Sequence, residues 1–341
     1  MLFHRFSLIL FISLLLGACA GSPVKRRYFW PPLPDIPRVE YIGSYRTITD
    51  FPKTKESDIV LESIFGTEDS KFLFIKPWGI ASDAKGHTYI TDAPRASIFI
   101  FDMMKKTVSV VEKVGSPYGI VIDREGRLFT SSGKHKMILV YDAAGSPLWS
   151  FGEGIIKGPA GMAINEELGL LYVADTKAHD IKVFNLSGDF LFAIGKRGSG
   201  KGEFNFPTDI DITSKGDLVI ADSMNARVQV LDSEGAFIRS FGQRGMGINR
   251  FQVMKGIAVD SEDHIYVVDT MGSHIKIFTM EGDLLLVIGG PYSGIAPGGF
   301  NLPMDIDIDD NDTIFITDQQ NRAFHQFQYM NEKYLESHPV K

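Results

Sequence analysis

The sequence predicts an all-β fold, a six-bladed β-propeller of four-stranded antiparallel blades. Six stretches of the chain are versions of one pattern, and their starts lie 40 to 48 residues apart, a spacing typical of an array of supersecondary units. The stretches are PWGIASDAKGHTYITD (77–92), PYGIVIDREGRLFTSS (117–132), PAGMAINEELGLLYVAD (159–175), PTDIDITSKGDLVIAD (207–222), KGIAVDSEDHIYVVD (255–269) and PMDIDIDDNDTIFITD (303–318). With 341 residues, 44% of them hydrophobic, the chain is long enough to bury a large core.

Each unit contains four short segments of β type. GIAVD leads through a Gly/Asp turn to a second strand such as IYVVD (265–269). A third strand follows, for example ARVQVLD (226–232) or HIKIFTM (274–280), and then a fourth such as GAFIRSFG (235–242). Four antiparallel strands per unit make one propeller blade, so six units predict six blades.

The repeat pattern resembles a known family. PTDIDI…GDLVIADSMNARVQVLDSEGAFIRSFG resembles the NHL repeat from end to end, and the resemblance covers roughly residues 58–331. It implies a six-bladed propeller and says little about activity, because the chemistry of a propeller lies in its loops.

The ring is expected to close with a strand from the N-terminal side. The last repeat ends with its third strand, in NRAFHQFQYM (321–330), and no fourth strand follows. We expect DIVLESIFG (58–66) to supply it, which would remove two exposed sheet edges.

The first 18 residues have the pattern of a secretory signal. A basic start (His4, Arg5) precedes an apolar run of 11 residues, 6–16, which is too short to span a bilayer. The following LGAC resembles the bacterial lipobox, which implies that Cys19 is lipidated and becomes the mature N-terminus. Cys19 is also the single cysteine of the chain, so the exported domain has no disulfide. The alternative is an ordinary signal peptide with an incidental cysteine.

The remaining boundaries follow from composition. Residues 19–57 are expected to be a lipid-anchored tether, because four prolines between residues 31 and 37 favour extended backbone. Within the tether Tyr28, Phe29 and Trp30 either belong to a plain spacer or dock onto the domain or a partner. The propeller is expected over 58–331, followed by a C-terminal tail over 332–341.

One loop resembles a nucleotide-binding motif. GKRGSGKG (195–202) differs from the phosphate-binding pattern G-x-x-x-x-G-K-[ST] only in its last residue. It aligns without a gap on GQRGMGIN (242–249), and a strand follows instead of the helix that a phosphate site needs. We interpret it as the connection between two blades.

The innermost strands carry two pairs of carboxylates. Period-2 alternation places Asp209 with Asp211, and Asp305 with Asp307, on the channel side of their strands. These four could bind Ca²⁺ or Mg²⁺ through oxygen ligands; otherwise they line a water-filled channel and hydrogen-bond to backbone and water. Family relatives that cleave peptidylglycine derivatives use histidines there, and this sequence has none on an expected innermost strand.

Two further groups are candidates for recognition. Trp78, Tyr118, Asp209, Lys255 and Asp305 are expected at repeat-equivalent positions beside the channel mouth, where an aromatic pair next to charges can bind a ligand. Arg197 and Arg244 lie in equivalent connections of adjacent blades and mark one rim. They are either solvated loop charges or a docking patch for an acidic partner or a lipid headgroup.

The aspartate that recurs at the end of the second strand is expected to be structural. It occurs in five of the six repeats, as Asp92, Asp175, Asp222, Asp269 and Asp318. Its carboxylate is expected to accept backbone N–H bonds, and Ser132 replaces it in the second repeat, where the turn should be less well tied.

Charge and export limit the function. The 35 Lys and Arg against 42 Asp and Glu give a net charge of −7, which disfavours nucleic acid, although local basic patches remain open. We expect no cofactor other than the cation considered above. The sequence predicts a scaffold for binding or assembly with a protein partner in the bacterial cell envelope. Because the residue after Cys19 is Ala20 and not Asp, we expect the protein to be anchored on the periplasmic side of the outer membrane. The alternative is a metal-dependent hydrolase or lyase with its site at the channel mouth.

Overall fold

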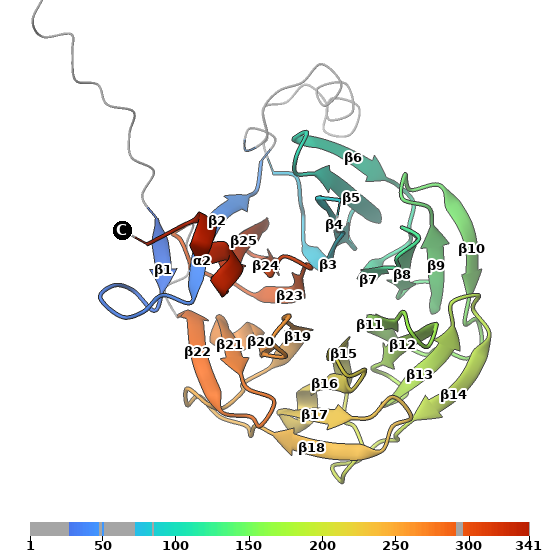
Figure 1. The fold of residues 1–341 in the computed structure, drawn as a ribbon. Coiled ribbons are helices and arrows are strands. Elements are labelled where there is room, and N and C mark those ends of the chain that lie inside the picture. The colour runs from blue at the N-terminus through green and yellow to red at the C-terminus, as the bar shows by residue number, and fades with distance from the viewer. Residues whose placement is uncertain (1–26, 48–49, 51–71, 84, 291–295, 341) are drawn as a thin grey trace, which may run out of the picture.

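Six antiparallel sheets are arranged in a ring around a central axis in the computed structural model (Figure 1). The structure describes residues 27–47, 50, 72–83, 85–290 and 296–340. The predicted six-bladed propeller of four-stranded antiparallel blades is confirmed, and each repeat motif begins at or next to the start of the innermost strand of its blade.

The first five blades each use four consecutive strands. Blade 1 contains β3 (Pro77–Ser82), β4 (His87–Asp92), β5 (Ser97–Asp102) and β6 (Thr107–Val111). Blade 2 contains β7 (Pro117–Ile122), β8 (Leu128–Ser132), β9 (Met137–Tyr141) and β10 (Pro147–Phe151). Blade 3 contains β11 (Pro159–Asn165), β12 (Leu170–Asp175), β13 (Asp180–Asn185) and β14 (Phe190–Ile194). Blade 4 contains β15 (Pro207–Ile212), β16 (Leu218–Asp222), β17 (Arg227–Leu231) and β18 (Phe237–Phe241). Blade 5 contains β19 (Met254–Val259), β20 (Ile265–Asp269), β21 (His274–Phe278) and β22 (Leu284–Gly289).

The sixth blade joins the two ends of the chain. Its strands β23 (Pro303–Ile308), β24 (Thr313–Asp318) and β25 (Ala323–Tyr329) are followed in the sheet by β2 (Val39–Tyr45). The N-terminal closure is therefore confirmed, but the expectation that residues 58–66 supply the strand is wrong. Val39 pairs with Tyr329 and Tyr45 pairs with Phe324, so β2 occupies the position next to β25. Residues 58–66 lie outside the described part of the chain.

Part of the segment expected to be a tether belongs to the same sheet. β1 (Tyr28–Trp30) pairs with β2 as a fifth strand, and the rings of Trp30 and Tyr41 meet Phe327 at 5.7 and 5.3 Å. Of the two alternatives for the aromatic leader, docking onto the domain describes Trp30. Beyond β25, the helix α2 (Glu332–Ser337) lies within the expected tail, and Tyr334 donates to Glu40 Oε2 at 3.0 Å.

The hydrophobic core lies between neighbouring blades. For example, Val219 and Val228 of blade 4 pack with Val267 and Phe278 of blade 5 in one buried cluster. Proline is tolerated at the first position of the innermost strands because these strands form one edge of their sheets. The N–H that proline lacks is not needed there for a hydrogen bond between strands.

The recurring aspartate ties each blade to the loop that leads into it, as predicted. Asp175 accepts hydrogen bonds from the backbone N–H groups of Lys157 (2.7 Å) and Gly158 (2.8 Å). Asp92, Asp269 and Asp318 bind the corresponding loop N–H groups in their blades, and Asp222 binds Asn205 N. In blade 2 the Ser132 hydroxyl instead donates to Gly115 O at 2.6 Å and accepts from His135 N in the following turn at 3.3 Å, so it bonds to a carbonyl oxygen, not to N–H groups, of the loop that leads into the blade.

Cys19 and the expected signal peptide lie outside the described residues. Within the described part of the chain, no helix has the length and apolar character needed to cross a membrane.

Candidate functional site

The first residues of the innermost strands form two rows around one end of the channel. The first row comprises Trp78, Tyr118, Ala160, Thr208, Lys255 and Met304, and the second comprises Gly79, Gly119, Gly161, Asp209, Gly256 and Asp305. The five residues expected beside the channel mouth therefore do not share one repeat-equivalent position, and that expectation is wrong. Asp209 and Asp305 lie in the second row, and the other three lie in the first. Met254, and not Lys255, pairs with the recurring aspartate as Pro207 does, so the fifth repeat is offset by one residue.

All five mouth candidates nevertheless line one cavity, of about 250 Å³. The rings of Trp78 and Tyr118, from adjacent blades, lie 4.8 Å apart at 59°. Lys255 reaches from blade 5 to place its ammonium 5.9 Å from the centre of the Trp78 ring. Burial lowers the pKa of Lys255. An aromatic wall beside a half-buried cation suits a ligand with an apolar part and an anionic group.

Asp209 and Asp305 lie between this cavity and the channel below. Both also line a second cavity of about 190 Å³ among the innermost strands. Asp209 Oδ2 accepts from Ile257 N at 2.8 Å, and Asp305 Oδ2 accepts from Ile80 N at 3.1 Å. Each carboxylate thus links its own innermost strand to that of the next blade.

The lower pair of carboxylates makes the same kind of link. Asp211 Oδ2 accepts from Val259 N at 2.8 Å, and Asp307 accepts from the Ser82 hydroxyl. In the part of the chain that the structure describes, no three or more His, Cys, Asp or Glu side chains are grouped to hold a metal ion. Each of the four carboxylates is thus hydrogen-bonded to a neighbouring innermost strand.

Burial in the channel keeps these acids more protonated than usual. Desolvation raises the pKa of Asp211 and of Asp307 to about 7. The pKa of Asp209 is raised by burial first and by the nearby Asp305 second, and the pKa of Asp305 is raised by burial. Because two neighbouring buried carboxyls do not ionise together easily, the upper pair favours a state that shares one proton.

Phe206 completes the aromatic wall, and sequence reasoning missed it. Its backbone N–H donates to His179 Nδ1 at 3.1 Å, and the two rings meet edge to face at 4.5 Å. Phe206 has φ +55°, an uncommon value for a bulky residue, but Ser116 and Leu302 before the equivalent prolines share it, so the strain is a feature of the repeat.

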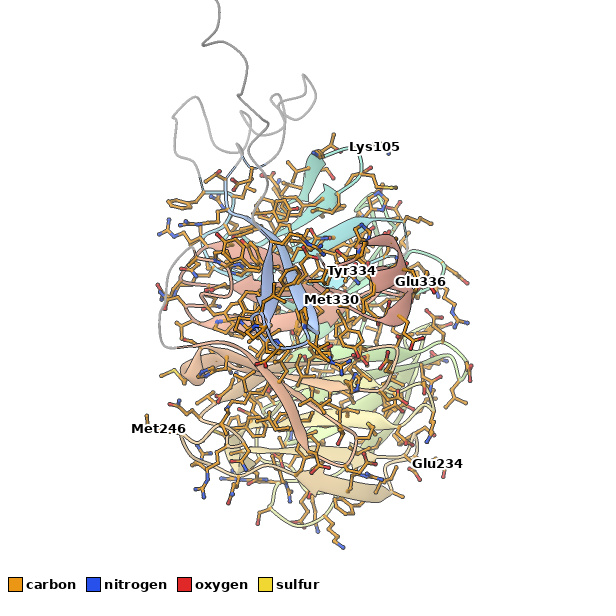
Figure 2. All side chains as sticks on the ribbon, turned by 60° about the vertical axis from the view of Figure 1, so that its left-hand side comes forward. Lys105, Glu234, Met246, Met330, Tyr334 and Glu336 are labelled. Carbon is orange, nitrogen blue, oxygen red and sulfur yellow. The ribbon has the colours of Figure 1, made fainter. Side chains whose placement is uncertain are left out.

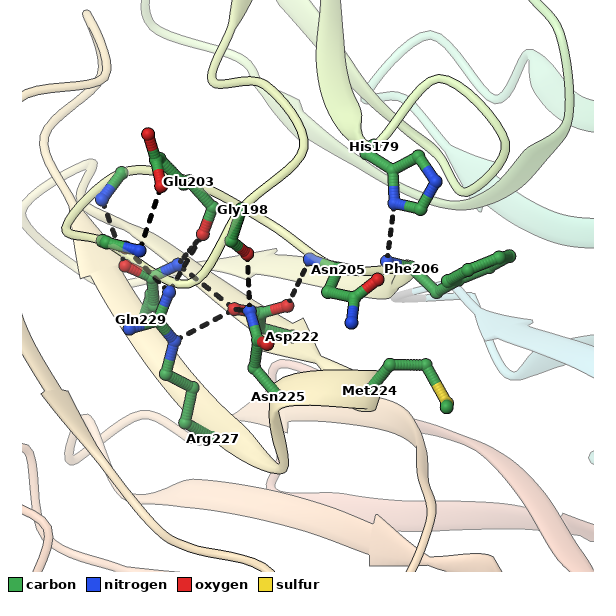
Figure 3. A network of polar contacts seen from close by, with 12 residues as sticks. His179, Gly198, Glu203, Asn205, Phe206, Asp222, Met224, Asn225, Arg227 and Gln229 are labelled. Atoms are coloured by element: carbon green, nitrogen blue, oxygen red, sulfur yellow. Dashed lines mark hydrogen bonds and ion pairs between the residues drawn. The ribbon is translucent and has the colours of Figure 1, made fainter.

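Phe206 lies in the loop that begins with GKRGSGKG (195–202), the segment that resembles a nucleotide-binding motif. This loop joins β14 to β15, as the sequence interpretation predicts. Asp222 binds the Asn205 N–H at 2.7 Å and Arg227 Nε at 2.8 Å, and Arg227 donates in turn to the carbonyl oxygens of Gly200 and Glu203 (Figure 3). These bonds occupy two of the loop's backbone oxygens and hold the loop against blade 4.

The two predicted rim arginines differ in their surroundings. Arg244 donates to Met224 O at 2.7 Å and to Gln252 O at 3.3 Å, so its guanidinium holds its own connection against blade 4. Arg197 is exposed. Both lie on the face of the ring where the innermost strands begin, which we call the mouth face.

The cavity also contains residues that no repeat comparison singled out. Besides Phe206, these include Lys177 and Thr208. A signal for Phe206 exists in the sequence, because it alone places an aromatic residue before the repeat proline; Lys177 lies in an ordinary turn and carries none.

Comparison with known proteins places the chain among propellers without naming an activity. A family model described as "6-bladed beta-propeller" matches residues 162–224 and 213–285. No curated protein matches the chain.

Several solved structures are similar in fold. A Bacteroides thetaiotaomicron protein of unknown function is 15% identical, with a TM-score of 0.66 over 85% of this chain and 75% of that one. A gluconolactonase from Xanthomonas campestris is 15% identical, with a TM-score of 0.60 over 75% and 86% of the two chains. Virginiamycin B lyase from Staphylococcus aureus is 15% identical, with a TM-score of 0.55 over 74% and 95%. At this identity the similarity shows the fold alone.

Proposed function

We propose that this chain is an exported, lipid-anchored binding and assembly module of the bacterial cell envelope, and that the channel mouth is its recognition site. The signal-like N-terminus with the LGAC motif at Cys19 supports export and anchoring. Because Ala20 follows Cys19, we place the module on the periplasmic side of the outer membrane, with an NHL-type propeller as its recognition domain.

One observation carries the choice of site. Side chains from most of the blades, far apart in the sequence, converge on one cavity that contains an aromatic wall, a half-buried lysine and a carboxyl pair. In the described part of the chain no carboxylate pairs with Lys255, so its charge remains available to a ligand.

These groups favour an acidic peptide segment as the ligand. The segment's carboxylate would pair with Lys255, its apolar part would pack on Trp78 and Tyr118, and its N–H groups would donate to the Asp209–Asp305 pair. Partly desolvated charge-assisted bonds of this type contribute about 1.5–3 kcal/mol each.

A site-specific photo-cross-linker tests the proposal in cells. A photoreactive phenylalanine replaces Tyr118 at the mouth, and a matched variant carries it at Leu168, which is 54% exposed on the opposite face. We expect an adduct with an envelope protein from position 118, none of this size from position 168, and loss of the adduct on Lys255→Met. An adduct that persists in Lys255→Met, or that forms equally at both positions, would contradict the assignment of the mouth.

Anchoring has its own test. The Cys19→Ala variant is expected to leave the outer-membrane fraction, where the wild-type protein should be found with an acyl chain. Lipid anchoring would be contradicted if the variant fractionates as the wild type does and the wild-type protein carries no acyl chain.

A further inference from the structure

The loops on the two faces of the propeller differ strongly in charge. The mouth face carries the loops that lead into the innermost strands and those between second and third strands; the remaining loops and α2 lie on the opposite face. In the described parts of these loops, the mouth face holds fourteen Lys and Arg against four Asp and Glu, whereas the opposite face holds eight against twenty-one. The net charge of −7 therefore conceals a basic face and an acidic face.

The basic face also exposes large apolar side chains at its loop tips. In the connection between blades 4 and 5, Met246 is 88% exposed and Ile248 is 67% exposed. Met224 and Met271, in the turns of the same two blades, are 48% and 58% exposed. Figure 2 shows Met246 projecting on one side of the molecule and Glu234, Lys105 and Glu336 on the other. Apolar tips among basic residues are typical of surfaces that enter the headgroup region of a bilayer.

The chain enters the domain beside this sector. β1 contacts β22 of blade 5, and Trp30 lies against Gly298 in the loop that follows that blade. β25 begins at the mouth face, and β2, which is antiparallel to β25, ends at that face. β1 is antiparallel to β2, so it runs away from the mouth face. Cys19 precedes Tyr28 by nine residues, which span at most about 30 Å when fully extended. Tyr28 pairs with Tyr41 near the middle of β2, and Arg27 donates to Pro339 O at 3.1 Å, so this length reaches either face of the ring. A lipid on Cys19 would therefore bring the membrane within reach, and the charge of the mouth face selects the face that docks.

We propose that the blade 4 and 5 sector of the mouth face docks onto an anionic phospholipid surface, with Met246 and Ile248 inserted among the headgroups. This inference rests on the proposed lipid anchoring for the nearness of the membrane, and on the basic charge of the mouth face together with the exposed apolar tips of blades 4 and 5 for the docking itself. Because the apolar tips lie on blades 4 and 5, the contact is tilted, and the mouth stays accessible from blades 1–3.

A fluorescent probe at the loop tip tests the docking. The lipidated full-length chain is reconstituted in phosphatidylcholine vesicles with and without phosphatidylglycerol, and carries an environment-sensitive thiol probe at Met246→Cys or at the matched control Glu234→Cys. Lipidation consumes the thiol of Cys19, so only the introduced cysteine reacts. We expect a blue-shifted emission, shielded from aqueous quenchers, at position 246 in anionic vesicles only, and an aqueous emission at position 234 throughout.

Charge reversal and salt make the test specific. Arg197→Glu with Arg250→Glu, both exposed on the mouth face, is expected to weaken docking by at least about thirtyfold, from two surface charges. Lys215→Glu with Lys333→Glu, which makes the same charge change on the opposite face, is expected to leave it unchanged. About 1 M salt should abolish the signal at position 246 while the chain still floats with the vesicles, because screening does not release a lipid anchor.

Failure of docking and failure of anchoring give different results. If position 246 stays aqueous on anionic vesicles with which the chain floats, docking is overturned, and an acidic protein becomes the alternative occupant. If the wild-type chain reacts with the probe at Cys19 and does not float, anchoring is overturned. The reading at position 246 is then repeated in a Cys19→Ser background, where an aqueous emission would overturn docking as well.

Discussion

Gly161→Ala is expected to destabilise the propeller through the upper carboxyl pair. Gly161 is in the second row of the mouth, where β11 of blade 3 passes β15 of blade 4. A Cβ added to Gly161 would lie 1.7 Å from Asp209 Oδ1 and 2.8 Å from Asp209 Cα. Neither approach is compatible with van der Waals contact, so the Asp209 side chain and part of the β15 backbone must move.

The magnitude follows from what that movement disrupts. Overpacking of a tight site costs about 1–3 kcal/mol. Displacement of Asp209 also breaks its 2.8 Å bond with Ile257 N, and leaving that buried N–H without a partner costs about 1–3 kcal/mol. The free energy of unfolding should therefore fall by about 2–6 kcal/mol, a large share of the stability of an ordinary domain.

Chemical denaturation of the mature chain measures this loss, with Gly290→Ala as the matched control. A Cβ at Gly290 would find no heavy atom of the described chain within 4 Å, so that variant should stay within about 0.5 kcal/mol of wild type. In a double-mutant cycle with Asp209→Ala, the two losses should be less than additive because both remove the same bond. A Gly161→Ala variant as stable as Gly290→Ala would refute the close approach of the two strands.

Three further predictions concern stability. Because burial raises the pKa of Asp211 to about 7, the folded chain holds a proton there that the unfolded chain releases near pH 4; stability should fall as pH rises from 4 to 7. Asp211→Asn, which keeps an acceptor for Val259 N, should remove the contribution of Asp211 to this slope and leave those of Asp209, Asp305 and Asp307. Denaturant titrations at pH 5 and 8 should show the variant to be more stable than wild type at pH 8, by up to about 4 kcal/mol. Lys276→Met breaks a 2.8 Å ion pair with Asp269, both under 5% exposed, and should lower the free energy of unfolding by about 3–5 kcal/mol; a loss below 1 kcal/mol would contradict the pair's role. Trp30→Ala should lower the melting temperature and expose the closing sheet to proteolysis, and an unchanged digestion pattern would count against a structural role for β1.

The choice of the closing strand shows where sequence reasoning ends. VEYIGSY (39–45) and DIVLESIFG (58–66) are both short segments of β type, and local pattern does not rank them. β25, the strand beside which β2 closes the ring, lies more than 250 residues further along the chain. In the structure Tyr41 meets Phe327 at 5.3 Å and Tyr45 stacks on Phe324 at 4.7 Å, and cross-strand aromatic pairs of this kind stabilise the pairing of β2 with β25.

The sequence by itself determined the number of blades, the four-stranded pattern of the blades, the turn role of the recurring aspartates and five of the residues that line the mouth. These features repeat at a fixed period, so short-range pattern is enough to find them. Only the tertiary structure decided which strand closes the ring, that Phe206 joins the mouth, that Asp209 and Asp211 link blade 4 to blade 5, and that the charges separate onto two faces. Each of these depends on which blades become neighbours and on which end of a strand a loop lies, and that information exists only once the ring has closed.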